Sequence, residues 1–118
     1  MVEIMTMKCD VTHVHEDVIK RVKKSDINII EKTAVMFKVL GNKTRLQIVD
    51  VLKDDELCVC DIAVLIDMTQ SAVSHQLKKM KELGVVRSRR DGVVIYYSLI
   101  DEHIKDIYVE AYNHICNC

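Results

Sequence analysis

Apolar residues recur at spacings of three and four over long stretches of this chain, which is the pattern of amphipathic helices. Ser25 or Asp26 stands where the N-cap of one such helix is expected, and Gly41 stands where that helix ends. The chain has no Pro and only three Gly, so helices with few breaks are expected. In the first half of the chain the pattern predicts three helices, over residues 15–24, 27–40 and 46–52.

A second pair of helices is predicted around a tight turn at residues 67–69. The first helix is short, over residues 59–66, and the second runs over residues 70–83 with Thr69 as its cap. The apolar residues of the second helix that are expected to point inward are Val73, Leu77, Met80 and Leu83. Its polar side chains are left on the outward face.

The period then changes from helical to strand-like. Residues 85–90 and 93–99 are β-rich, and the pair Asp91-Gly92 between them is typical of a hairpin. A last helix is predicted over residues 102–115. Helix, short helix, turn, helix and hairpin is the order of a winged helix-turn-helix, so we expect a mainly α fold with a β-hairpin wing, of the α+β class.

Composition limits what such a chain can be. Its 118 residues, 49% of them apolar, make one domain with a core of its own. No apolar run approaches the roughly 20 residues of a membrane span and no secretory signal is evident, so we expect a cytoplasmic protein without a membrane partner. Five Cys in a cytoplasmic chain favour metal or redox chemistry over structural disulfides.

Charge is concentrated in one region although the formal net charge is only −1. Residues 78–90 contain six Lys or Arg and one acid, which is the local basic face that phosphate contact needs. The alternative is a solvated basic helix followed by an ordinary hairpin. The order of the elements favours double-stranded DNA as the partner. The residues expected to contact it are Gln70, Ser71, Ser74, His75, Gln76, Lys78, Lys79, Arg87, Arg89 and Arg90.

Cys58 and Cys60 form the first candidate metal site. At the entrance of a helix, with the first Cys still outside it, both sulfurs can face one ion, and a soft cation needs about four donors. Residues 1–14 are expected to be a flexible arm that offers more of them, ahead of a DNA-binding and dimerisation domain over residues 15–118. The alternative is two inert core cysteines. The remaining candidate ligands are Cys9, Asp10, His13, His15 and Asp61.

The last helix carries a second candidate metal site, with Asp101 and His103 at its start and His114 and Cys118 at its end. His103 and His114 share a face but lie roughly 16 Å apart along the axis, so one ion cannot bridge them within a helix. Two such helices packed antiparallel across a dyad would bring them together, which requires a homodimer. The alternative is a pair of histidines making ordinary hydrogen bonds. Cys116 and Cys118 either substitute as ligands or have no role.

Four segments resemble the ArsR/SmtB family of metal-sensing repressors, and in particular its branch that senses cadmium, lead and zinc: residues 40–48, 56–63, 71–77 and 101–104. The resemblance implies a homodimer that binds operator DNA without metal and is released by Cd²⁺, Pb²⁺ or Zn²⁺. It also implies that the arm crosses to the partner's Cys pair, with Cys9 as third thiolate. Asn117 is a weaker ligand than the Glu or His of the family pattern. Ala63 replaces a Cys of the arsenic-sensing branch.

Two other functions share parts of this pattern. A repressor of the same fold could sense oxidants or persulfides through Cys58, Cys60 or Cys9. A metal-buffering protein without DNA binding would not need the basic helix and wing. No open zinc site with a general base and no phosphate loop appears in the sequence, so we expect neither an enzyme nor a small organic substrate.

Overall fold

The structure is a computed structural model that describes residues 13–117, and it divides into two units at residues 31 and 32, each considered by itself. The first unit holds α1 (Glu16–Arg21) and the beginning of α2 (Ile27–Leu40). Helix α1 is shorter than predicted because the backbone is already extended at Val22. The cap predicted at residue 25 or 26 is Asp26, which accepts the N–H of Asn28 at 2.8 Å.

The second unit contains the remaining helices, each begun by the cap that its sequence provides. Asn42 accepts the N–H of Arg45 at 3.0 Å, and Thr69 accepts the N–H of Ala72 at 3.1 Å, as predicted. No helix among the described residues is both long and apolar enough to cross a bilayer. The helices are α3 (Lys43–Leu52), α4 (Val59–Ile66), α5 (Gln70–Glu82) and α6 (Glu102–Cys116).

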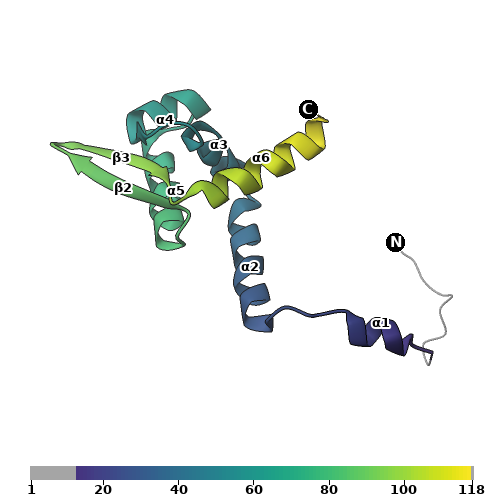
Figure 1. The fold of residues 1–118 in the computed structure, drawn as a ribbon. Coiled ribbons are helices and arrows are strands. Elements are labelled where there is room, and N and C mark those ends of the chain that lie inside the picture. Colours follow the sequence, from purple (N-terminus) through teal and green to yellow (C-terminus); the bar gives the residue numbers. More distant parts are fainter. Residues whose placement is uncertain (1–12, 118) are drawn as a thin grey trace. The chain divides into compact units, whose positions relative to one another are not determined.

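The hairpin projects beside these helices, as Figure 1 shows. Strands β2 (Val86–Asp91) and β3 (Val94–Leu99) pair antiparallel from Val86 opposite Leu99 to Asp91 opposite Val94. Gly92 takes a positive φ of 66° in the turn, which lies one residue later than predicted. The fold class is confirmed as helical with a β-hairpin wing.

A third strand, β1 (Leu57–Cys58), was not predicted. It lies on the other side of β3, so the order in the sheet is β1-β3-β2. Leu57 pairs with Tyr97 and Cys58 with Tyr96, both antiparallel. Two residues are too few to show the alternation by which a strand is recognised in a sequence. The strand leads directly into α4, so the start of that helix is fixed by the sheet.

The core lies between α3, α4, α5 and the base of the hairpin. Three of the four apolar residues predicted to point inward from α5 are fully buried there. The inward prediction for Leu83 was wrong: α5 ends at Glu82, and Leu83 is 44% exposed where the chain turns into Gly84, whose φ is 76°. The largest fully buried side chains are Ile48, Ile62, Leu77, Met80, Val49, Val73, Val85 and Val86.

Helix α6 is joined to α3 by a hydrogen bond at its middle. The hydroxyl of Tyr108 donates to Asp50 Oδ1 at 3.0 Å, and Asp50 also pairs with Lys53 at 3.0 Å. Burial raises the pKa of Tyr108 to about 12, and the hydrogen bond to Asp50 acts in the same direction. Tyr108 is therefore held neutral and positions α6 on the helix that leads to the thiols.

Leu77 and Leu83 provide a matched test of the α5 packing. Leu77→Ala should lower the free energy of unfolding by about 2–5 kcal/mol, since Leu77 is fully buried and its removal leaves a cavity. Leu83→Ala removes the same atoms from an exposed position and should lower it by less than about 1 kcal/mol. Urea unfolding followed by circular dichroism measures both. Equal losses would contradict the exposure of Leu83 beyond the end of α5.

Candidate metal and nucleic-acid sites

Cys58 and Cys60 stand at the start of α4, in the arrangement that the sequence predicted. Cys58 is the N-cap, with extended φ and ψ of −87° and 168°, and Cys60 is the second residue of the helix. Both thiols are free; Cys58 is half-buried and Cys60 is exposed. Neither is an inert core cysteine, because the buried face of α4 consists of Ile62, Ala63 and Ile66.

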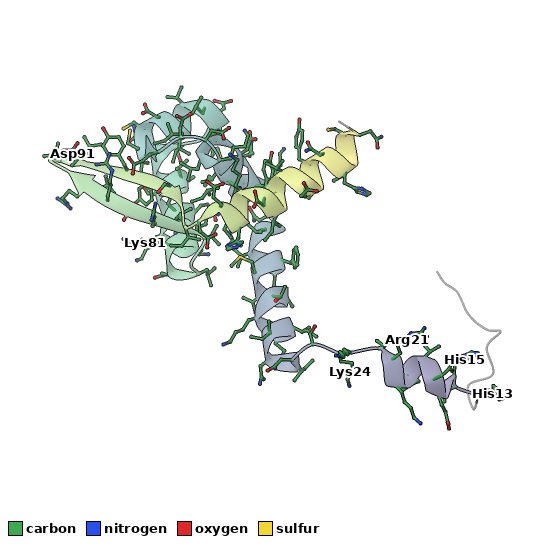
Figure 2. The ribbon with its side chains drawn as sticks, in the orientation of Figure 1. His13, His15, Arg21, Lys24, Lys81 and Asp91 are labelled. Carbon is green, nitrogen blue, oxygen red and sulfur yellow. The ribbon has the colours of Figure 1, made fainter. Side chains whose placement is uncertain are left out.

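The other donors expected at this site do not all lie on the same element as the thiols. Asp61 is exposed in the first turn of α4, beside the thiols in sequence. Figure 2 shows His13 and His15 at the start of α1, in the other unit, and His15 is the N-cap of that helix. Cys9 and Asp10 lie outside the described residues. Over residues 13–117 no group of three or more His, Cys, Asp or Glu is gathered around one point.

This donor set fits a soft cation, although it is incomplete within the described chain. Zn²⁺, Cd²⁺ and Pb²⁺ all bind thiolate ligands well, and this site offers two thiols. The thiol of Cys60 is exposed to solvent, and that of Cys58 is half-buried. A further two donors are needed for a tetrahedral site. Any complete site at α4 therefore draws ligands from outside this helix.

The second candidate site begins at the N-terminus of α6. Asp101 caps the helix: its Oδ1 accepts the N–H of His103 at 3.0 Å, while its Oδ2 lies 3.4 Å from Nδ1 of the same residue. The hydrogen bond from the His103 side chain lowers the pKa of Asp101, so the carboxylate stays charged. The structure thus brings Asp101 and His103 together and leaves Nε2 of the imidazole without a role in this contact.

The other end of α6 carries the remaining residues of that set. His114 lies in the last turn and is exposed. Asn117 follows as the C-cap with φ of 59°, a left-handed conformation that Asn tolerates better than most residues. The left-handed backbone therefore explains why Asn stands at position 117 without requiring a bound metal. Cys116 is the last residue of α6 and is exposed. Cys118 lies outside the described residues.

Helix α5 presents a polar face suited to a DNA groove. Six of the seven residues predicted on it to contact DNA are exposed: Gln70, Ser71, Ser74, His75, Lys78 and Lys79. Gln76 differs, because it is half-buried and its Oε1 accepts Arg45 Nε at 3.1 Å. Arg45 also donates to the carbonyl of Val39 at 3.3 Å, so Gln76 helps to join α3 to α5.

The three arginines of the wing differ in the contacts that they make. Arg90 lies next to Asp91, which Figure 2 labels at the tip of the hairpin, and it forms no ion pair with any described residue. Arg87 lies nearer the base and donates to the hydroxyl of Ser98 at 3.3 Å. Arg89 forms an ion pair with Glu56 at 2.7 Å. That contact lowers the pKa of Glu56 and raises the pKa of Arg89.

Sequence reasoning missed several residues that shape these sites. Lys81 donates to Ser88 at 2.8 Å and so joins α5 to the wing, and Lys105 of α6 holds Asp54 at 2.9 Å. Glu56 was not among the residues expected to contact metal or DNA, yet it pairs with Arg89 of the wing. The acidic run at residues 54–56 was the available signal, because three adjacent acids facing a basic wing are expected to find cationic partners.

Comparison with known proteins agrees with this geometry. Residues 42–88 match the family described as bacterial regulatory protein, arsR family. The chain is 41% identical over 109 residues to the cadmium resistance transcriptional regulatory protein CadC homolog of Staphylococcus aureus, covering 90% of this chain and 89% of that one. It is 35% identical over 109 residues to the transcriptional repressor SmtB homolog of a Synechocystis species, covering 91% and 83%. A solved homodimeric winged helix-turn-helix domain, Mb0332 of Mycobacterium bovis, superposes with a TM-score of 0.68 at 31% identity, covering 80% and 94%.

The exposure of the two thiols predicts their order of reaction. Iodoacetamide should alkylate Cys60 faster than Cys58, because Cys60 is exposed and Cys58 is half-buried as the N-cap and in the sheet. Quenched time points, digested and analysed by mass spectrometry, give the rate at each position. Urea-unfolded protein is the control, in which the two rates should converge. Faster reaction at Cys58 in the folded protein would contradict this arrangement.

Proposed function

Because the chain belongs to the arsR family of bacterial regulatory proteins, which are transcriptional regulators and not enzymes, we propose that it is a metal-responsive repressor. It binds double-stranded operator DNA as a metal-free homodimer and is released by a soft or borderline divalent cation, Cd²⁺, Pb²⁺ or Zn²⁺. The observation that carries the proposal is the pair of free thiols at the start of α4, the first helix of the helix-turn-helix. The names of the cadmium-resistance and SmtB relatives support it.

The proposed DNA contacts come from two elements. The exposed polar face of α5 enters the major groove, where Gln70, Ser71, Ser74 and His75 reach base edges or phosphates. Lys78 and Lys79 follow on the same helix and contact the backbone. The wing adds phosphate contacts from its arginines, which contribute affinity without reading sequence.

The proposed dimer uses the apolar groove between α2, α3 and α6. Phe37, Tyr112 and Ile115 line this groove and are all largely exposed in the single chain. Large apolar side chains exposed together on one face indicate a surface that is covered by a partner. The homodimeric state of the Mb0332 domain supports a second copy as that partner.

The same dimer supplies the ligands that each chain lacks. At α4, we propose that Cys58 and Cys60 are joined by Cys9 from the arm of the partner, with His13, His15, Asp10 or Asp61 as the fourth donor. At α6, Asp101 and His103 of one chain meet His114 of the other. This second site is the weaker of the two, because Asn117 offers one neutral oxygen.

Fluorescence anisotropy of labelled operator DNA tests the proposal directly. The metal-free, reduced protein should bind, and Cd²⁺, Pb²⁺ or Zn²⁺ should release it. Operator binding that none of the three metals changes, but that peroxide abolishes and a reducing agent restores, would show that thiol oxidation and not metal is the effector. A protein that binds these metals but does not bind operator DNA even when it is metal-free would instead favour the metal-buffering alternative.

Cys58→Ser and Cys60→Ser separately should abolish release by Cd²⁺ and leave metal-free operator binding unchanged. The reason is that both thiols stand at the start of α4, on a different element from the proposed DNA-contacting face of α5. Titration of each variant by anisotropy gives both quantities, and the ultraviolet thiolate-to-cadmium band should weaken in parallel. Full Cd²⁺ response in both variants would place the effector site elsewhere.

Arg90→Gln should flatten the salt dependence of operator binding. Each neutralised phosphate contributes about 0.9 to the magnitude of the log–log slope, so the loss should be up to about one unit. Val93→Ala, three positions further on in the same hairpin and 96% exposed, removes no charge and serves as the control. An unchanged slope for Arg90→Gln would remove the wing tip from the backbone contact.

A further inference from the structure

Cys58 and the wing share one row across the sheet. Cys58 on β1 pairs with Tyr96 on β3, and Tyr96 pairs with Arg89 on β2. Residues directly opposite one another in antiparallel strands present their side chains on the same face. The guanidinium carbon of Arg89 lies 4.8 Å from the centroid of the Tyr96 ring, so this side chain folds back over the sheet toward β1.

Glu56, two residues before Cys58, holds the end of that side chain. Arg89 Nε lies 2.8 Å from both carboxylate oxygens of Glu56, and Nη2 lies 2.7 Å from one of them. The fork of N–H groups on a guanidinium matches a carboxylate or a phosphate, and the same donors cannot serve both. The carboxylate of Glu56 therefore occupies the Nε–Nη2 edge of the guanidinium, one of the edges on which a DNA phosphate could be held, and neutralises its charge.

The other wing arginines carry no such competitor. Arg87 donates to a neutral hydroxyl, and Arg90 has no acidic partner at ion-pair distance among the described residues. Arg89 is thus the one wing arginine of the three whose charge is already neutralised by a described carboxylate. For phosphate contact this pair is unfavourable, because it neutralises one of the three positive charges of the wing.

We propose that Glu56 competes with the DNA backbone for Arg89, and that ligation of Cys58 strengthens the competitor. The second part rests on the proposed function. Ligation at Cys58 restrains β1 and the residue two positions before it, so less conformational entropy is lost when Glu56 holds Arg89. Since the pair neutralises the guanidinium and holds one of its edges, whatever favours the pair weakens phosphate contact at Arg89 and disfavours the DNA-bound state.

A double-mutant cycle on metal-free protein tests the competition. Glu56→Gln keeps the shape of the side chain and should tighten operator binding roughly two- to fivefold, the scale of one exposed ion pair. Arg89→Gln should weaken binding more in the Glu56→Gln background than in the wild-type background. Anisotropy at fixed salt measures all four proteins. Equal weakening in the two backgrounds would overturn the competition.

Asp54→Asn is the matched control for charge. It removes one negative charge from the same linker, but Asp54 pairs with Lys105 of α6 and not with the wing. It should therefore tighten binding less than Glu56→Gln does. Tightening of the same size in both variants would mean that general repulsion of DNA by the linker explains the effect, and the competition would be wrong.

Cadmium titrations test the link to Cys58. The ratio of operator affinities without and with Cd²⁺ should be smaller in Glu56→Gln than in the wild type. If Cd²⁺ releases both proteins to the same extent, the link is wrong while the proposed effector stands. If Cd²⁺ does not release the wild type, both the effector and the link are wrong, and the metal-free cycle alone decides the competition.

Discussion

The pairing of Leu57 and Cys58 with β3 is the constraint on which the candidate sites depend. These two residues end one connection and begin α4 without a gap, so their hydrogen bonds to β3 set where the helix starts and where both thiols stand. The partner strand β3 is also one arm of the wing. A very short strand therefore ties the thiols, the first helix of the helix-turn-helix and the wing hairpin to one sheet.

Most of the fold could be predicted because the helices of the second unit are amphipathic and carry clear caps. The spacing of Val73, Leu77 and Met80 located the buried face of α5, and Thr69 located its start. The prediction failed where periodicity stops carrying information. Strand β1 is too short to show alternation, and Leu83 fits the helical spacing although α5 has already ended. The first error is an element too short to carry a pattern, and the second falls at the end of a helix, where backbone geometry and not side-chain pattern decides.

The sequence predicted which residues belong to the candidate sites better than it predicted which of their side chains contact one another. The position of Cys58 outside α4 followed from the requirement that two sulfurs face one ion, and the structure has that position. The engagement of Arg89 by Glu56 joins residues 33 positions apart, which no local pattern reveals. Asn117 illustrates the opposite limit: its left-handed backbone explains its identity as well as any ligand role would. The ligands proposed from a second chain belong to an assembly that one sequence specifies only indirectly.

The contrast between the core and the linker over residues 54–56 suits a regulator. The side chains between α3, α4 and α5 are fully buried and hold those helices rigidly, because repacking them would open cavities. The linker instead carries two exposed ion pairs, Asp54 to Lys105 on α6 and Glu56 to Arg89 on the wing. Exposed pairs of this kind contribute about 0–1 kcal/mol each, so binding events can exchange them without disturbing the fold. A switch needs states that differ by a few kcal/mol at most, and in this chain contacts of that strength join the linker that precedes the thiols to α6 and to the wing.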